Sequence, residues 1–95
     1  MAWVYILHCA DDSLYVGATT DLASRIADHQ AGKGGSYTSR RRPVVLAYSE
    51  ECSDIRAAVA RERQFKMWTR QKKQALIRGD FDSLGKLARR RPRKL

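Results

Sequence analysis

The 95-residue sequence lacks a long apolar run, and it has few cysteines and no basic leader segment. No stretch of 18 consecutive apolar residues is present, so the sequence predicts no transmembrane helix. Its first residues lack the basic start and the small-residue cleavage site of a signal peptide. The two cysteines, Cys9 and Cys52, are too few and too far apart for a disulfide framework. We therefore expect reduced, buried thiols in a cytoplasmic protein, with one structural disulfide as the alternative.

Acidic residues are scarce and unevenly distributed. Nineteen Lys and Arg stand against ten Asp and Glu, which gives a formal net charge of +9. All ten acidic residues lie within residues 1–82, whereas residues 83–95 contain six basic residues and no acidic one. A basic body followed by a more basic segment predicts a polyanionic partner, most often a nucleic acid. A solubilising or targeting tail is the alternative.

The hydrophobic pattern predicts one small α+β domain with the element order β-β-α-β-α-α. Strands are predicted over residues 3–9, 14–19 and 44–49, and the polar turn between the first two indicates a hairpin. Helices are predicted over residues 22–31, 54–68 and 70–78. Asp21 and Ser53 are the expected N-caps, and Gly32 and Gly79 end the first and the last helix. Residues 32–42 are predicted to form a flexible basic loop, residues 1–80 the folded domain, and residues 81–95 a mobile basic tail.

A glutamate interrupts the apolar side of the second long helix. Apolar positions recur along this helix up to Phe65, and position 62 falls in that series, yet it is Glu62. A carboxylate at the edge of the core is costly unless a positive group meets it. The glutamate is either paired with Lys66 or Arg63, or it lies at a solvated rim position. The other alternative is a ligand for Mg²⁺, which uses one or two protein carboxylates and keeps several waters.

Two further groups of residues carry candidate chemistry. Arg25 and His29 lie four residues apart and therefore project from one helix face. A guanidinium group suits a phosphate and an imidazole can relay a proton, although a solvated polar face is the alternative. Tyr37 lies in the predicted basic loop, where it indicates a nucleic-acid contact that combines stacking with phosphate attraction. The basic residues of that loop are Lys33, Arg40, Arg41 and Arg42.

A series of short motifs follows one order along the chain. The series comprises Val4-Tyr5-Ile6, Tyr15-Val16-Gly17, Thr20-Asp21-Leu22, Arg25-Ile26, His29, Gly32-Lys33-Gly34, Tyr37-Thr38, Arg42-Pro43-Val44, Tyr48-Ser49-Glu50, and Ala60-Arg61-Glu62 with Lys66. In this order the sequence resembles the GIY-YIG nuclease superfamily, with the first two motifs as the two halves of its signature. The resemblance extends from residue 3 to about residue 78. It points to the small stand-alone bacterial GIY-YIG proteins, which are related to the N-terminal domain of the excinuclease C subunit.

The resemblance implies a small three-stranded antiparallel sheet flanked by helices. It also implies a metal-dependent endonuclease that hydrolyses DNA phosphodiester bonds with little sequence specificity, in DNA repair or processing. The expected partner is DNA, with branched or damaged DNA and RNA left open. We expect neither a membrane partner nor an organic cofactor.

The resemblance also assigns roles to residues. Glu62 would hold one Mg²⁺ or Mn²⁺, and Arg25 would neutralise charge that grows on the phosphoryl oxygens. Tyr5 or Tyr15 would orient or deprotonate the attacking water with help from His29. A phenol has a reference pKa of about 10, so a tyrosine base needs a nearby cation, for which Arg25 and Lys33 are the candidates. The implied nucleic-acid contacts are Gly17, Lys33, Tyr37, Arg40, Arg41, Arg42 and Lys66.

Two positions depart from the family pattern. Trp3 stands where the signature has its first glycine. Many active members carry an asparagine after the metal-binding glutamate, but this chain contains no asparagine, and Gln74 is the candidate replacement. The alternative functions are a nucleic-acid-binding module with a weak or inactive site, and a basic ribosome-associated structural protein.

Overall fold

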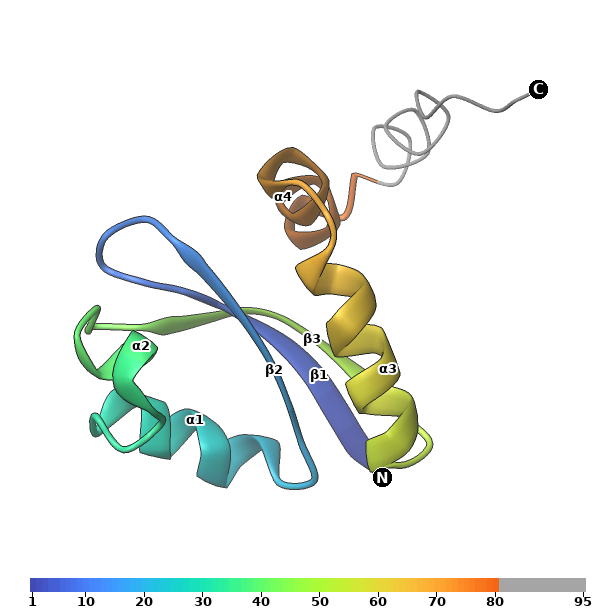
Figure 1. Ribbon diagram of the computed structural model, residues 1–95, viewed down its shortest axis with the longest axis horizontal. Helices are drawn as coiled ribbons and strands as arrows, with labels where there is room; N and C mark the ends of the chain where they lie inside the picture. The colour runs from blue at the N-terminus through green and yellow to red at the C-terminus, as the bar shows by residue number, and fades with distance from the viewer. Residues whose placement is uncertain (81–95) are drawn as a thin grey trace.

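A short run of β-favouring apolar residues forms the central strand of a three-stranded antiparallel sheet in the computed structural model, which describes residues 1–80 (Figure 1). The elements in chain order are β1 (Ala2–His8), β2 (Leu14–Thr19), α1 (Leu22–Gln30), α2 (Ser36–Ser39), β3 (Val45–Cys52), α3 (Ile55–Lys66) and α4 (Arg70–Arg78). The strand order is β2-β1-β3. The expected α+β fold with a three-stranded sheet and flanking helices is confirmed. The single-turn helix α2 is an addition to the predicted order.

The register of the hairpin places the two signature tyrosines on one face of the sheet. In the antiparallel pairing of β1 with β2, Tyr5 lies opposite Gly17 and Leu7 lies opposite Tyr15. Directly opposite residues of antiparallel strands point to the same face, and successive residues of one strand alternate. Tyr5 and Tyr15 therefore share a face with Leu7.

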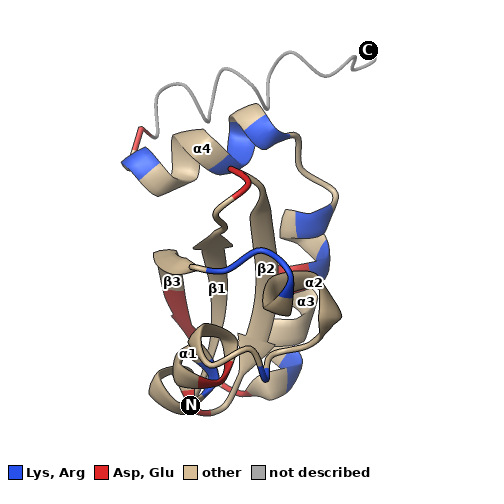
Figure 2. Cartoon of the chain, turned by 90° about the vertical axis from the view of Figure 1, so that its left-hand side faces the viewer, with Lys and Arg blue, Asp and Glu red and all other residues tan. Residues whose placement is uncertain are grey.

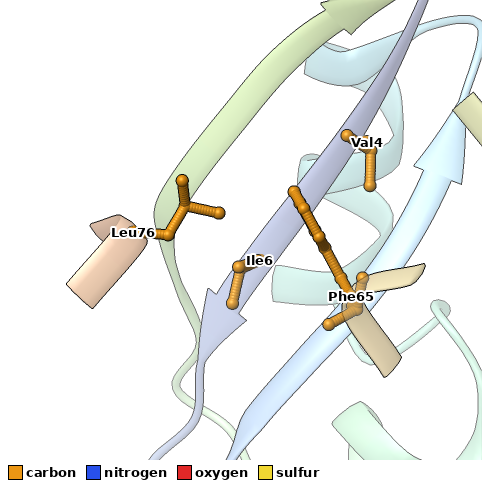
Figure 3. Close-up of a cluster of buried hydrophobic side chains, with 5 residues drawn as sticks. Val4, Ile6, Phe65 and Leu76 are labelled. Carbon is orange, nitrogen blue, oxygen red and sulfur yellow. The ribbon is translucent and has the colours of Figure 1, made fainter. Parts of the chain in front are cut away.

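Each face of the sheet has its own apolar cluster because β1 is apolar along both of its faces. On one face, Val4 and Ile6 pack with Val16 of β2, Phe65 of α3 and Leu76 of α4 (Figure 3). These core side chains are at most 4% exposed.

The opposite face carries the side chains that alternate with this set along β1. Tyr5, Leu7 and Cys9 form the second cluster with Val44, and Leu22 and Ile26 of α1 pack against it. Helices α3 and α4 thus cover one face of the sheet, while α1 and α2 lie over the other (Figure 1).

The helix ends show which residues satisfy the free backbone N–H groups. Asp21 caps α1 as predicted, because its carboxylate accepts a hydrogen bond from the backbone N–H of Ser24. The prediction of Ser53 as the cap of α3 is wrong: Asp54 takes an extended conformation and accepts from the N–H of Ala57. A carboxylate at this position also meets the positive end of the helix dipole. Gly79 ends α4 with a φ of 71° in the left-handed region, as predicted.

Residues 32–42, predicted as a flexible loop, are tied into the fold. Helix α2 lies within this segment, and its Thr38 is fully buried. The carbonyl of Arg41 accepts a 2.9 Å hydrogen bond from the N–H of Ala10, which joins the end of the segment to the β1–β2 turn. Glycine and serine content indicated flexibility, but contacts with distant residues fix the segment, and local composition carries no sign of them.

Three further expectations concern burial, membranes and the tail. Both cysteines are free, as expected; Cys9 is buried, whereas Cys52 is only half-buried. No helix within residues 1–80 is long and apolar enough to cross a membrane. The predicted basic tail, residues 81–95, lies outside the described residues.

Candidate active site

Three buried side chains form a hydrogen-bonded chain between β1, α1 and α2. The Tyr5 hydroxyl lies 2.9 Å from Nε2 of His29, and Nδ1 of the same imidazole lies 2.8 Å from the Thr38 hydroxyl. All three residues are at most 1% exposed. His29 occupies the last turn of α1, where the helical repeat places it on the same side as Ile26, above the Tyr5 face of the sheet.

Two glycines make room for this chain. A Cβ atom on Gly17 would overlap the Tyr5 hydroxyl, and one on Gly34 would overlap the His29 imidazole. Gly17 belongs to the second half of the signature and lies directly opposite Tyr5 in the sheet. The signature glycine therefore has a packing reason here, since it leaves space for the phenol of Tyr5.

Arg25 lies beside the hydroxyl end of this chain. Its guanidinium donates a 3.3 Å hydrogen bond to the Gly34 carbonyl and is 4.0 Å from the Asp28 carboxylate. Burial raises the pKa of Tyr5, although a hydrogen bond from Arg25 acts in the opposite direction. Burial lowers the pKa of His29, and the charge of Arg25 lowers it further. At neutral pH, Tyr5 is thus a phenol and His29 a neutral imidazole.

These states fix the direction of the hydrogen bonds. Arginine only donates, so the Tyr5 O–H has to donate to another acceptor, and among the described residues its hydrogen-bond partner is Nε2 of His29. A neutral imidazole that accepts at Nε2 carries its proton on Nδ1. We therefore assign the Nδ1–H of His29 as the donor to the Thr38 hydroxyl.

Tyr15 and Tyr37 extend the site with an aromatic stack. The Tyr15 ring lies 5.3 Å from the His29 ring and is stacked at 5.7 Å on Tyr37, centroid to centroid. The Arg41 guanidinium lies 3.8 Å from the centroid of Tyr37 and forms a 2.9 Å ion pair with Asp11 in the β1–β2 turn. Tyr37 is 38% exposed. Tyr37 and Arg41 therefore have partners within the fold, and these partners hold the aromatic stack over Tyr15.

Glu62 approaches this site from α3, which packs along β2 and β1. Its side chain is 19% exposed, and its carboxylate lies 2.8 Å from the ammonium of Lys66. The Glu62 charge also acts on Tyr5, as the smallest of the causes that raise the pKa of its phenol. The structure thus contains the ion pair with Lys66 and also brings the carboxylate toward the residues of the motif.

The donor set around Glu62 fits one type of metal site. Within residues 1–80, no group of three or more His, Cys, Asp and Glu side chains is arranged to hold a metal ion. Zinc sites usually need such a group, whereas Mg²⁺ binds through one or two carboxylates, waters and substrate phosphates. Glu62 fits the second pattern as a single hard oxygen ligand.

Other predicted residues lie away from this cluster. Lys33, Arg40 and Arg42 are exposed, and Arg42 donates a hydrogen bond to the Ser39 carbonyl. Gln74 does not join the tyrosines, because it lines a separate cleft beside His8 and α4. The expectation that it takes the place of the family asparagine at the site is therefore wrong.

Sequence reasoning assigned no role to Thr38, Gly34 or Asp11. Thr38 stands in the motif Tyr37-Thr38 and Gly34 in the motif Gly32-Lys33-Gly34, so the series of motifs already contained both positions. Thr38 bonds His29 nine residues away, and the Gly34 carbonyl accepts from Arg25, also nine residues away. Asp11 bonds Arg41 thirty residues away, and nothing in the local pattern indicates these contacts.

Comparison with known proteins agrees with this geometry. Residues 1–75 match the family described as the GIY-YIG catalytic domain. A UPF0213 protein of Staphylococcus haemolyticus is 51% identical over 75 residues, which cover 79% of this chain and 92% of that protein. A UPF0213 protein of Haloquadratum walsbyi is 51% identical over 81 residues, with 84% and 90% covered.

A solved structure supports the same relationship. The solution NMR structure of a UPF0213 protein from Bacillus halodurans is 40% identical, with a TM-score of 0.52, and the match covers 81% of this chain and 83% of that one. GIY-YIG domains are generally nucleases that use a divalent metal ion, so the match implies a nuclease-type function for this fold. The chain belongs to the GIY-YIG family, and its relatives are the small stand-alone UPF0213 proteins.

Proposed function

We propose that the protein is a metal-dependent endonuclease that hydrolyses DNA phosphodiester bonds with little sequence preference. The observation that carries the proposal is the convergence at the Tyr5 hydroxyl. His29 contacts this hydroxyl directly, and the Arg25 and Glu62 side chains both act on its pKa, in opposite directions. Nonspecific cleavage suits a role in DNA repair or processing.

The proposed chemistry begins with a proton relay from water to His29. The attacking water gives a proton to the Tyr5 oxygen while the Tyr5 proton passes to Nε2 of His29, 2.9 Å away. The phenol stays neutral throughout, so its raised pKa is no obstacle, and the imidazole becomes an imidazolium. Thr38 keeps the Nδ1 proton in place, which leaves the Nε2 lone pair free to act as the base.

Arg25 and Glu62 would act on the phosphate. Arg25 would stabilise charge on the phosphoryl oxygens, because its positive charge already acts on the hydroxyl at which the water would be activated. Glu62 would hold Mg²⁺ or Mn²⁺. A bound ion supplies Lewis-acid stabilisation of the phosphate and of the leaving oxygen. Lys66 neutralises the Glu62 carboxylate through its ion pair.

DNA would be held by the exposed cations next to α2, namely Lys33, Arg40 and Arg42. Figure 2 shows Lys and Arg beside α2 and on the helices α3 and α4. Such residues contact phosphates and position the duplex without reading bases, which explains the low sequence preference. We propose that the basic residues of 81–95 add to these contacts, and deletion of the segment should flatten the dependence of DNA affinity on salt by roughly 3 units of log K against log salt.

The test is nicking of supercoiled plasmid with Mg²⁺ or Mn²⁺ by wild type, Glu62→Gln and Glu51→Gln. Glu51 is an exposed glutamate near the end of β3, so it is a matched control for the same chemical change. We expect Glu62→Gln to lower nicking by orders of magnitude, and Glu51→Gln to leave it near the wild-type rate. Equal rates for Glu62→Gln and wild type would remove Glu62 from the mechanism.

A second candidate function is nucleic-acid binding without cleavage. The observation that favours it is the close ion pair between Glu62 and Lys66, which gives the carboxylate a partner other than a metal. The same assay separates the two functions, because a binding module would retain DNA affinity and show no metal-dependent nicking in any of the three proteins.

A further inference from the structure

A cleft of about 320 Å³ lies on the sheet face that α3 and α4 cover. Its apolar surface comes from Leu14 of β2, Ala47 of β3 and Ile77 of α4. Polar side chains of α4 line another side. A cleft of this size, with apolar walls and a few polar groups, is of the kind that binds small ligands or single chemical groups.

The cleft is separate from the tyrosine cluster, by which we mean Tyr5, Tyr15 and Tyr37 around His29. Leu14 lies opposite His8 in the hairpin, and His8 alternates with Leu7 along β1, so the cleft residues point away from the Tyr5 face. Helix α4 packs on the same side, since Leu76 contacts the cluster around Ile6. A ligand in the cleft would thus lie across the sheet from the residues proposed to cleave DNA.

One wall of the cleft is lined by basic side chains of α4. Arg70, Gln74 and Arg78 are spaced four apart, so they follow one side of α4. Residues 63–79 contain six Lys and Arg and no Asp or Glu. Helix α4 itself contributes four cations and no acidic residue to this side of the sheet.

Asp12 is the acidic residue at the mouth of the cleft, and its charge is already matched. Its carboxylate lies 2.6 Å from Nε2 of His8 and 3.2 Å from a guanidinium nitrogen of Arg70. Asp12 holds a positive φ of 71°, unusual for a residue with a side chain. Figure 2 shows this acidic turn directly beside the basic helix α4. Asp12 therefore orients Arg70 at the rim, and the Asp80 carboxylate lies 3.5 Å from the guanidinium of Arg78. The four cations of α4 still outnumber these two carboxylates.

We propose that this cleft binds one unpaired nucleotide of a DNA strand. The guanidinium groups of Arg70 and Arg78 contact its phosphate, because a guanidinium fork matches phosphate oxygens. The base lies against the apolar surface around Ala47 and Ile77, with the Gln74 amide at its edge. That the polymer is DNA rests on the proposed function, whereas binding in the cleft needs neither Glu62 nor a metal ion.

The proposal narrows the class of substrate. A straight duplex is stiff over many base pairs, so it lies along one side of a small domain. A strand that occupies the cleft while the tyrosine cluster engages a phosphodiester has to pass around the sheet. The favoured substrates are therefore duplexes with an unpaired strand, such as a flap, rather than continuous duplex.

The first experiment records NMR amide shifts of the full ¹⁵N-labelled chain in EDTA with thymidine 5′-monophosphate, and separately with inorganic phosphate. EDTA removes divalent metal, so the result does not depend on catalysis. We expect the nucleotide to shift Leu14, Ala47 and Ile77, and phosphate alone to shift only the arginine wall. Equal shifts with both probes would overturn the proposed base contact, and shifts confined to the Tyr5 face would overturn the site.

The second experiment uses variants that separate the effect of positive charge from the effect of free volume in the cleft. Arg78→Gln should weaken nucleotide affinity about tenfold, while Arg56→Gln, at an exposed arginine of α3 outside the cleft, should not. Ala47→Met fills the cleft without a change in charge and should abolish the shifts at Leu14 and Ile77, with retained folding verified by thermal unfolding. Equal losses from both arginine variants would overturn the site, because binding would then follow net charge alone.

Binding to DNA gives the last comparison. Wild type in EDTA should bind a duplex with a single-stranded flap more tightly than the continuous duplex, and Ala47→Met should lose this preference. A folded Ala47→Met protein that keeps the preference would overturn the proposal. A loss of preference combined with normal plasmid nicking would support the cleft and leave the proposed nuclease activity intact.

Discussion

Strand β1 contributes to both faces of the sheet, but the two faces bury different kinds of side chain. The face covered by α3 and α4 is apolar, with Val4 and Ile6 packed on Phe65 and Leu76. The face toward α1 buries Tyr5, His29 and Thr38 in a hydrogen-bonded chain. Apolar packing has no directional requirement, whereas each buried polar group needs a partner in place. The first face therefore supplies apolar burial, and the second also holds three buried polar groups in one geometry.

The largest expected effect on stability comes from the apolar face. Phe65→Ala should lower the free energy of unfolding by about 3–5 kcal/mol, because Phe65 is fully buried and its loss leaves a cavity. Met67→Ala is the control in the adjoining segment, since Met67 is 86% exposed. Urea titration of both variants gives the comparison. A loss below about 1 kcal/mol for Phe65→Ala would mean that this face is not the main source of stability.

The largest expected effect on cleavage comes from the polar face. Tyr5→Phe removes the hydroxyl that contacts His29, and nicking should fall by roughly 10²–10⁴-fold, the usual contribution of a proton-transfer group. Stability should fall by about 1–3 kcal/mol because Nε2 of His29 loses its partner. Tyr48→Phe is the matched control, since the Tyr48 hydroxyl donates to Glu50 at 2.7 Å outside the tyrosine cluster. Equal nicking by the two variants would contradict the proposed relay.

A smaller effect on nicking is expected from Thr38, which lies at the other end of the hydrogen-bonded chain from Tyr5. Thr38→Val keeps the shape but removes the oxygen that accepts from His29, so nicking should fall about tenfold and its pH profile should shift. Imidazole ¹⁵N shifts should report a change from the Nδ1–H tautomer. Thr38→Ser retains the hydroxyl and should restore both readouts. If Thr38→Val keeps the tautomer and the profile, Thr38 serves packing only.

The smallest expected effect is a pH dependence of stability from His29. Burial depresses its pKa in the folded state, so the unfolded chain binds the proton more readily. The stabilising contribution is therefore present above the unfolded pKa of about 6.5 and decreases as the pH falls toward the folded pKa. His29→Gln should flatten the slope of unfolding free energy between pH 7 and pH 5, and His8→Gln at the partly exposed histidine should keep it. A wild-type slope in His29→Gln would assign the effect to another group.

Elements whose hydrophobic pattern and end-marking residues both lie in one short stretch of sequence could be predicted. The hairpin has two β-favouring runs joined by a short polar turn, and α4 ends at Gly79 because a left-handed residue is needed there. Strand β3 extends through Glu50 and Glu51 to Cys52, beyond its predicted end. Charged residues disfavour a strand locally, but pairing with Ala2, Trp3 and Val4 of β1 supplies the hydrogen bonds that continue it.

The features of the candidate site also divide into those that the sequence could predict and those that it could not. The sequence by itself determined the residue types and the family signature, because periodicity and motif order are local properties of the chain. Only the tertiary structure decided that Thr38 orders the loop and holds the His29 proton, and that Gln74 lies across the sheet from Tyr5. These outcomes depend on contacts between distant segments, whose geometry follows from the packing of α1, α2 and α4 against the sheet and from no single stretch of residues.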